Sequence, residues 1–276
     1  METFSNLDYS ALDDRKPTRI KTSQITLPAM NILLGSLIVG GIILIMVIGA
    51  FGLDNGTENL ILLPILGAIS WFIYKHVYQS TDHAIRLSNF AATNKLAYSW
   101  GYLPNVGFKG ILGQGKGKYP ITSLIEGWIQ GNRFRFYHLA RLTTRGMYSI
   151  FEVELDQSYP HILLDSRSNS KLGVEIKKVL GENSLKRVEH EFERHSDVYS
   201  DVDNTLTLQV VEPSLMQSML DDSLNLDMEL VDDKLYLIVK FDYYNPTRMR
   251  YIFNAVEQIL NNLDAAPLDS PKHLRS

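Results

Sequence analysis

ITSLIEGWIQGNRFRFYHLARL, residues 121–142, is the stretch that decides the fold of this chain. Two apolar-rich runs flank its central Gly131-Asn132 pair, a pattern that is typical of a tight β-hairpin. Residues 147–155 follow with strict alternation, which puts every second side chain on one face. The sequence therefore predicts a three-stranded antiparallel meander over residues 121–155.

Further strands are predicted towards the C-terminus. They cover residues 162–164 after Pro160, 192–199 and 205–211, and a second hairpin of 224–231 and 234–241 around Asp232-Asp233.

Helices are predicted over residues 81–97, over 171–180 and for a short segment from Pro213. The strongest helical pattern begins at Pro246, which Asn245 precedes as the cap. Its apolar residues recur three and four positions apart: Met249, Ile252, Phe253, Val256, Ile259, Leu260 and Leu263. Residues 80–264 are thus expected to form an α+β domain, an antiparallel sheet with packed helices.

Two long apolar runs precede this domain. Residues 31–53 and 59–78 are almost free of charge and are separated by a short polar turn. A bilayer requires about 20 apolar residues per spanning helix, so the runs predict a two-helix transmembrane hairpin over residues 29–79. A buried hairpin in a soluble core and a cleaved signal peptide both fit the lengths less well.

Lys and Arg set the predicted orientation of this hairpin. They precede the first run and follow the second, whereas the turn at residues 54–58 has none. The positive-inside rule then predicts a multi-pass protein of the cell (inner) membrane with both termini cytoplasmic. Ser36 and Gly40 are spaced for close helix packing, which we expect within the hairpin rather than between copies, although homo-oligomerisation stays an alternative.

Outside the hairpin and the domain, both ends of the chain are mostly polar. Residues 1–28 have mixed charge and no clear periodicity, and they are expected to form a flexible cytoplasmic arm. Residues 265–276 are expected to be a disordered tail.

Charge is distributed unevenly although the net charge is only −4. Lys and Arg outnumber Asp and Glu by ten to two over residues 75–145, whereas acidic residues outnumber basic ones by twenty-three to thirteen from residue 151 onwards. Two interpretations of the basic half stay open: it contacts anionic lipid or a partner, or it neutralises the acidic half within one fold. Candidate contacts are Lys75, Arg86, Lys95, Lys109, Lys116 and Lys118.

Catalytic and metal-binding motifs are not completed. The chain has no cysteine, and the glycine-rich stretch 110–117 resembles a phosphate-binding loop but has Gly117 where a hydroxyl is needed. His190 and His195 are five apart, one more than a zinc-binding helix requires. The alternating basic and aromatic residues of 133–138 fit a strand with a core face better than a nucleic-acid platform. We therefore predict no catalytic residue, no cofactor, no metal and no nucleic-acid partner.

Several short stretches resemble a known family. They read FEVELD (151–156), YPHILLD (159–165), EFER (191–194), DVYS (197–200) and EPSLMQSML (212–220). In this order they are similar to a bacterial family of membrane proteins classed as a domain of unknown function. The resemblance implies an N-terminal transmembrane hairpin followed by a cytoplasmic α+β domain, and it supplies no catalytic residues.

Two functions are expected from these observations. The first is a non-enzymatic, membrane-anchored interaction module that binds a protein partner or the anionic lipid of the bilayer. The alternative is a ligand-binding protein or enzyme with an unrecognised site, in which Tyr98, Trp100, Tyr102 and Trp128 line a pocket.

Overall fold

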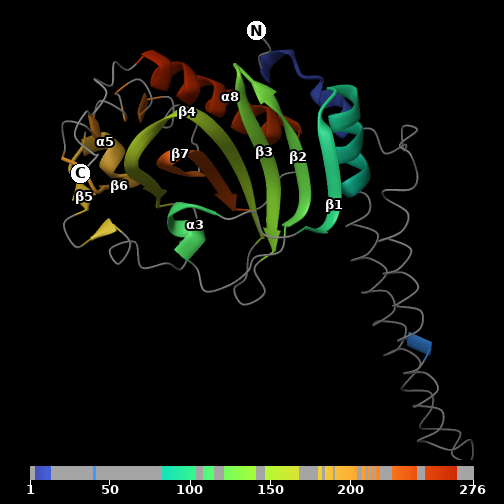
Figure 1. Cartoon of the computed structure of the whole chain (residues 1–276), viewed down its shortest axis with the longest axis horizontal. Coiled ribbons are helices and arrows are strands. Elements are labelled where there is room, and N and C mark those ends of the chain that lie inside the picture. The colour runs from blue at the N-terminus through green and yellow to red at the C-terminus, as the bar shows by residue number, and fades with distance from the viewer. Residues whose placement is uncertain are drawn as a thin grey trace, which may run out of the picture.

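The computed structural model describes residues 4–13, 40–41, 83–103, 108–114, 121–140, 147–167, 180–181, 184–188, 190–203, 207–208, 211, 213, 216–217, 226–240 and 246–265. Most of this is antiparallel sheet with helices packed on it (Figure 1). The elements are η1 (Phe4–Asn6), η2 (Tyr9–Leu12), β1 (Ala97–Leu103), α3 (Gly110–Gln114), β2 (Ile121–Ile129), β3 (Asn132–Ala140), β4 (Met147–Ser166), β5 (Leu185–Lys186), α5 (His190–Glu193), β6 (Ser196–Ser200), β7 (Leu226–Lys240) and α8 (Pro246–Ala265). Residues 83–93 are also helical.

The predicted meander is confirmed. β2 pairs with β3 and β3 with β4, all antiparallel. The turn between β2 and β3 consists of Gln130 and Gly131, one position earlier than predicted, and both have positive φ (49° and 85°), as a type I′ turn requires.

Strand β4 organises the rest of the sheet because it is 20 residues long. One of its edges pairs first with β3 and then with β6, while β7 pairs along the other edge on both sides of a register shift at residues 154–162. The predicted hairpin around Asp232-Asp233 is therefore wrong, since β7 is one bent strand. The predicted break at Pro160 is also wrong, because β4 continues through it.

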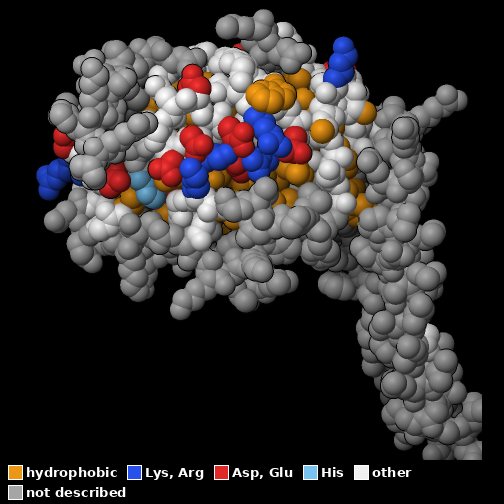
Figure 2. All heavy atoms as spheres, in the orientation of Figure 1, with side chains coloured by type: hydrophobic (Ala, Val, Ile, Leu, Met, Phe, Trp, Pro, Cys, Tyr) orange, Lys and Arg blue, Asp and Glu red, His pale blue; other side chains and the backbone are white. Residues whose placement is uncertain are grey.

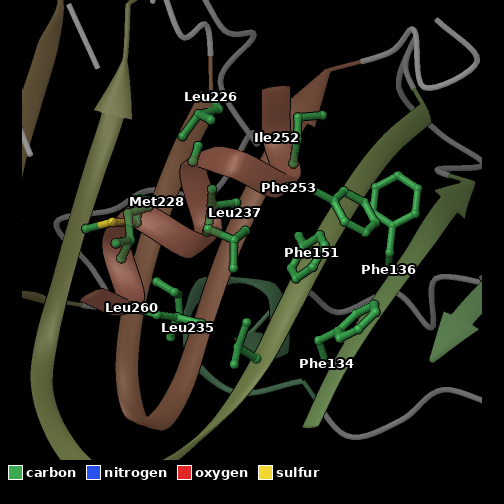
Figure 3. Packing of buried hydrophobic residues seen from close by; sticks show 14 of the residues in the cluster. Phe134, Phe136, Phe151, Leu226, Met228, Leu235, Leu237, Ile252, Phe253 and Leu260 are labelled. Atoms are coloured by element: carbon green, nitrogen blue, oxygen red, sulfur yellow. The ribbon is translucent and has the colours of Figure 1, made fainter. Parts of the chain in front are cut away.

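Bending of β4 and β7 wraps the sheet around α8 (Figure 3). Phe253 of α8 faces the rings of Phe151 and Phe136, with ring centroids 4.8 Å and 5.7 Å apart. Leu260 lies near Leu235, on the far side of the same core. All seven apolar positions predicted for the helix after Pro246 are buried.

Residues 4–13 pack as a strap across the end of this core, although they fall in the arm expected to be flexible. Phe4, Tyr9 and Leu12 are all buried against α8, helix 83–93 and the sheet. The rest of the expected arm, residues 14–28, lies outside the described residues.

The predicted fold class needs correction at its N-terminal part. No two-helix hairpin is found among the described residues, and in that part of the chain no helix is long and apolar enough to cross a membrane. This finding also contradicts the predicted multi-pass location. Of the two predicted spans, only Gly40 and Gly41 are described, both as helical.

Some of the elements predicted between residues 171 and 220 differ from those observed. β6 covers part of the predicted strand 192–199, but residues 190–193 form α5 instead. Residues 207–208 are helical, so the predicted strand 205–211 is wrong. Most of the predicted helix 171–180 lies outside the described residues.

Candidate interaction site

A pocket of about 390 Å³ opens where the strap meets the β2–β3 hairpin, and we call it the rim pocket. Three segments line it: Phe4, Asn6 and Leu7 of the strap, the turn at residues 93–96, and the hairpin. From the hairpin come Gly127, Trp128, Ile129 and Phe134. The pocket thus has an apolar floor and a polar lip.

Trp128 is one of the hairpin residues that line the rim pocket, and its side chain lies on the sheet face opposite Gly127 and Ile129. Its side chain is 63% exposed, the largest fraction among the large apolar side chains of the described residues. Strand alternation explains the exposure, because Ile129 beside it points into the core and leaves Trp128 facing outwards. Because tryptophan is enriched at protein interfaces, Trp128 marks a candidate contact surface.

Gly127 allows close packing at the pocket floor. A Cβ built at this position would lie 2.6 Å from Leu96 Cδ2 and 2.7 Å from Phe134 Cε1. Real Cβ atoms do not approach so closely, and the Phe134 ring is fixed in the core. The hairpin therefore packs against the turn at 93–96 only because residue 127 lacks a side chain.

The strap side of the pocket is held by Asn94. Its Oδ1 accepts a hydrogen bond from the Asp8 amide at 2.7 Å, and its Nδ2 donates to Asp8 O at 3.2 Å. The same Nδ2 donates to Phe90 O, which ends helix 83–93. Lys95, next to it, has φ +57° and is exposed. The pocket shape thus depends on the strap being docked.

A band of charged residues crosses the sheet face opposite α8 (Figure 2). It consists of Glu126, Arg133, Arg135, Glu152, Glu154 and Lys234, three acidic and three basic residues. The shortest pairs are Arg135–Glu154 at 2.6 Å, Arg133–Glu126 at 2.8 Å and Lys234–Glu154 at 2.8 Å. The band neutralises itself, so it favours a structural role over attraction of a charged ligand.

Arg135 lies at the centre of the charged band. Its side chain is 11% exposed and faces Glu152, which is buried and also accepts from the Tyr137 hydroxyl at 3.0 Å. Burial opposes the charged form of Arg135, but the surrounding carboxylates outweigh it and raise its pKa. Hydrogen bonding from Lys234 lowers the pKa of Glu154 although partial burial opposes this.

The glycine-rich segment meets a carboxylate of its own chain. Ile111 N donates to Glu229 Oε1 at 2.7 Å, and His161 Nε2 pairs with the same oxygen at 2.7 Å. Gly110, at φ +63°, packs directly on this fully buried carboxylate, where a side chain would collide. The amide at the start of α3 is thus engaged by Glu229, and no group of three His, Cys, Asp or Glu able to hold a metal is found in the described ranges.

The predicted contact residues are separated by the fold. Arg86 Nη1 donates to Leu12 O at 2.8 Å, and Lys109 forms ion pairs with Asp233 at 2.7 Å and Asp232 at 3.3 Å. Lys95 alone of the described candidates lines the rim pocket, while Gly40 lies exposed in its described helical turn. Lys75, Lys116, Lys118 and Ser36 lie outside the described residues.

Of the four aromatic residues expected to line a pocket, Trp128 does so. Tyr98 packs against the main core, Trp100 is half-buried on β1, and the side chain of Tyr102 lies outside the description. The sequence reading missed the strap, although Phe4, Leu7, Tyr9 and Leu12 recur every two or three residues in a largely polar stretch. That recurrence was the available signal.

Comparison with known proteins adds little. No family model matches the chain, and no curated protein matches its sequence. Among solved structures, the crystal structure of the mycobacterial trehalose monomycolate transport factor A, TtfA, is similar with a TM-score of 0.47 and 11% sequence identity. The match covers 64% of this chain and 92% of that chain. A similarity this weak supports no conclusion about fold or function.

Proposed function

We propose that this chain is a non-enzymatic interaction module that binds a segment of a protein partner at the rim pocket. The observation that carries the proposal is Trp128, a large apolar residue left 63% exposed in the hairpin that lines the rim pocket. Tryptophan is among the residues that contribute most to binding energy at protein interfaces.

The pocket lining defines the chemistry of the partner segment. Ile129, Leu96 and Phe134 offer an apolar floor that suits one large apolar side chain. Lys95 at the lip suits a carboxylate beside that side chain. The partner segment therefore carries an apolar anchor with an acidic neighbour.

Selection from a random peptide library on the full chain tests the proposal. Peptides that bind are expected to carry the apolar and acidic pair and to lose affinity about tenfold or more for Trp128→Ala, as anchor residues do. Leu185→Ala is the matched control, because Leu185 is also exposed (52%) but belongs to β5. Peptides that bind both variants equally would sink the proposal.

Binding to anionic lipid is the alternative function, and it must be tested on the same chain. Two of the described basic candidates, Arg86 and Lys109, already have partners within the fold, which favours a protein segment over a lipid surface. Pelleting with anionic but not with neutral vesicles, abolished by salt, would support the lipid version instead.

A second candidate function is the binding of a small molecule. The volume of about 390 Å³ falls at the lower end of the range of roughly 300–1,000 Å³ that ligand pockets occupy. A thermal-shift screen of nucleotides, lipids and small metabolites tests it. Stabilisation that Trp128→Ala removes and Leu185→Ala leaves intact would support this candidate, and a flat response would count against it.

A further inference from the structure

The strap occupies a groove in the way a bound peptide does. Its three buried side chains, Phe4, Tyr9 and Leu12, face the core, while Asn6 and Asp8 between them are exposed. This division into anchors and exposed residues is the pattern that peptide-binding grooves select.

Phe4 is the main anchor. Its ring meets those of Phe253, Phe134 and Phe151 edge-on, with centroids 4.7, 5.2 and 5.5 Å away. These rings come from α8, β3 and β4, so they form a preassembled aromatic socket. Edge-to-face contacts of this kind add to the gain from burial.

Tyr9 is the second anchor. Its ring lies 5.4 Å from Phe90 of helix 83–93, and the Arg250 guanidinium lies over it at 5.0 Å. The Tyr9 hydroxyl donates back to Phe4 O at 3.3 Å, which fixes the spacing between the two anchors.

Contacts to the strap backbone complete the groove. Phe4 N donates to Glu257 Oε2 at 3.1 Å, and Arg86 Nη1 donates to Leu12 O at 2.8 Å. Asn94 exchanges two hydrogen bonds with the backbone of Asp8. Side chains from the rest of the described fold, which we call the body, therefore bind the strap backbone at its start, middle and end. They do not recognise the exposed side chains of the strap.

We infer that this groove is a peptide-binding site, filled here in cis by the strap, and that it accepts the strap of a second copy of this chain. The connection between strap and body supports exchange. Residues 14–82 join them, although Leu12 O and Arg86 Nη1 lie only 2.8 Å apart. The 69 residues between the strap and helix 83–93 are enough chain for the strap to dock on a second copy.

The inference is independent of what the rim pocket binds, but the two sites are coupled. Phe4, Asn6 and Leu7 form one wall of the rim pocket. When a strap leaves, that wall leaves with it, and when the strap of a second copy docks, the wall is restored. Occupancy of the groove therefore controls whether the rim pocket exists.

Cleavage of the connection tests the groove as a peptide site. A protease site is inserted after Asp14 in the full chain, and the cut protein is titrated with a fluorescent synthetic peptide of residues 1–14. We expect saturable binding that Phe4→Ala in the peptide weakens about tenfold or more. Asn6→Ala is the matched control and should change affinity by less than about twofold, because Asn6 is exposed.

Three results would overturn the inference. They are equal binding of the Phe4→Ala and Asn6→Ala peptides, no binding at all, and loss of the sheet circular dichroism signal on cleavage, which would make the strap a fixed part of the core.

Exchange between copies is measured by energy transfer between donor- and acceptor-labelled uncut chains. The signal should rise with concentration, vanish when both copies carry Phe4→Ala, and persist in Trp128→Ala, which damages only the rim pocket. No transfer at any concentration would refute the exchange.

Discussion

His138 illustrates what burial does to a single titratable residue. It lies on β3 and is 1% exposed. Burial, helped by the nearby His83, lowers its pKa from 6.5 to about 3. The folded protein therefore keeps this imidazole neutral at pH values where the unfolded chain protonates it.

Stability should fall with acidification because of this residue. Between pH 6.5 and about 3 the unfolded chain binds a proton that the folded chain does not, so His138 costs up to about 1.4 kcal/mol per pH unit as the pH drops. Urea unfolding between about pH 4 and pH 7 should show a shallower pH slope for His138→Leu than for the parent. Identical slopes for the parent and His138→Leu would contradict this account.

At the scale of elements, the charged band joins four strands. Glu126 is on β2, Arg133 and Arg135 on β3, Glu152 and Glu154 on β4, and Lys234 on β7. Each ion pair therefore crosses a strand boundary. Burial differs along the band, because the Arg135 side chain is 11% exposed and the Arg133 side chain is 43% exposed.

This difference predicts unequal effects of two similar substitutions. Arg135→Ala leaves the buried Glu152 without one of its cationic partners and should lower the free energy of unfolding by about 3 kcal/mol. Arg133→Ala breaks a surface pair with Glu126 and should lower it by less than about 1 kcal/mol. Denaturant titration of both variants measures the difference, and equal losses would show that the band behaves as a set of surface pairs.

At the scale of the whole molecule, the strap ties separate parts of the fold together. Phe4 touches rings on β3, β4 and α8, and Arg86 of helix 83–93 holds the other end of the strap. Through Phe4, the strap contributes to one core shared by the sheet and α8.

Phe4→Ala in the full chain should therefore act globally. Removing a buried ring should lower the free energy of unfolding by about 3 kcal/mol or more, whereas exposed Asn6→Ala should change it by less than about 0.5 kcal/mol. Hydrogen exchange should speed up even in β6, whose Val198 belongs to the same core cluster although the ring contacts of Phe4 are to β3, β4 and α8. Faster exchange confined to β3 and α8 would mean that the strap stabilises only its own end.

Local patterns made part of this fold predictable. The β2–β3 hairpin follows from the apolar runs around Gly131, and α8 follows from the cap and spacing after Pro246. Both signals lie within a few residues of the elements they specify.

Patterns that depend on distant partners misled the sequence reading. Asp232 does adopt a positive φ of 51°, as a turn residue would, yet pairing with Tyr159 of β4 keeps β7 a single bent strand. Pro160 is tolerated inside β4 because it lies at the register shift, where a missing amide breaks no regular ladder. Aromatic residues such as Trp128 usually belong to a core. Trp128 is exposed because its neighbours Gly127 and Ile129 face inwards, and only the observed register reveals this.

The amide of Phe4 and the carboxylate of Glu257 that accepts its hydrogen bond are 253 positions apart in the chain. Ribosomes add about 5–20 residues per second, so Phe4 waits roughly 10 to 50 seconds before its socket on α8 has been made. During that time the first aromatic residues to be synthesised have no place to bury. Until then they are exposed apolar surface of the kind on which chaperones act, and any delay at the C-terminal end of synthesis prolongs their exposure.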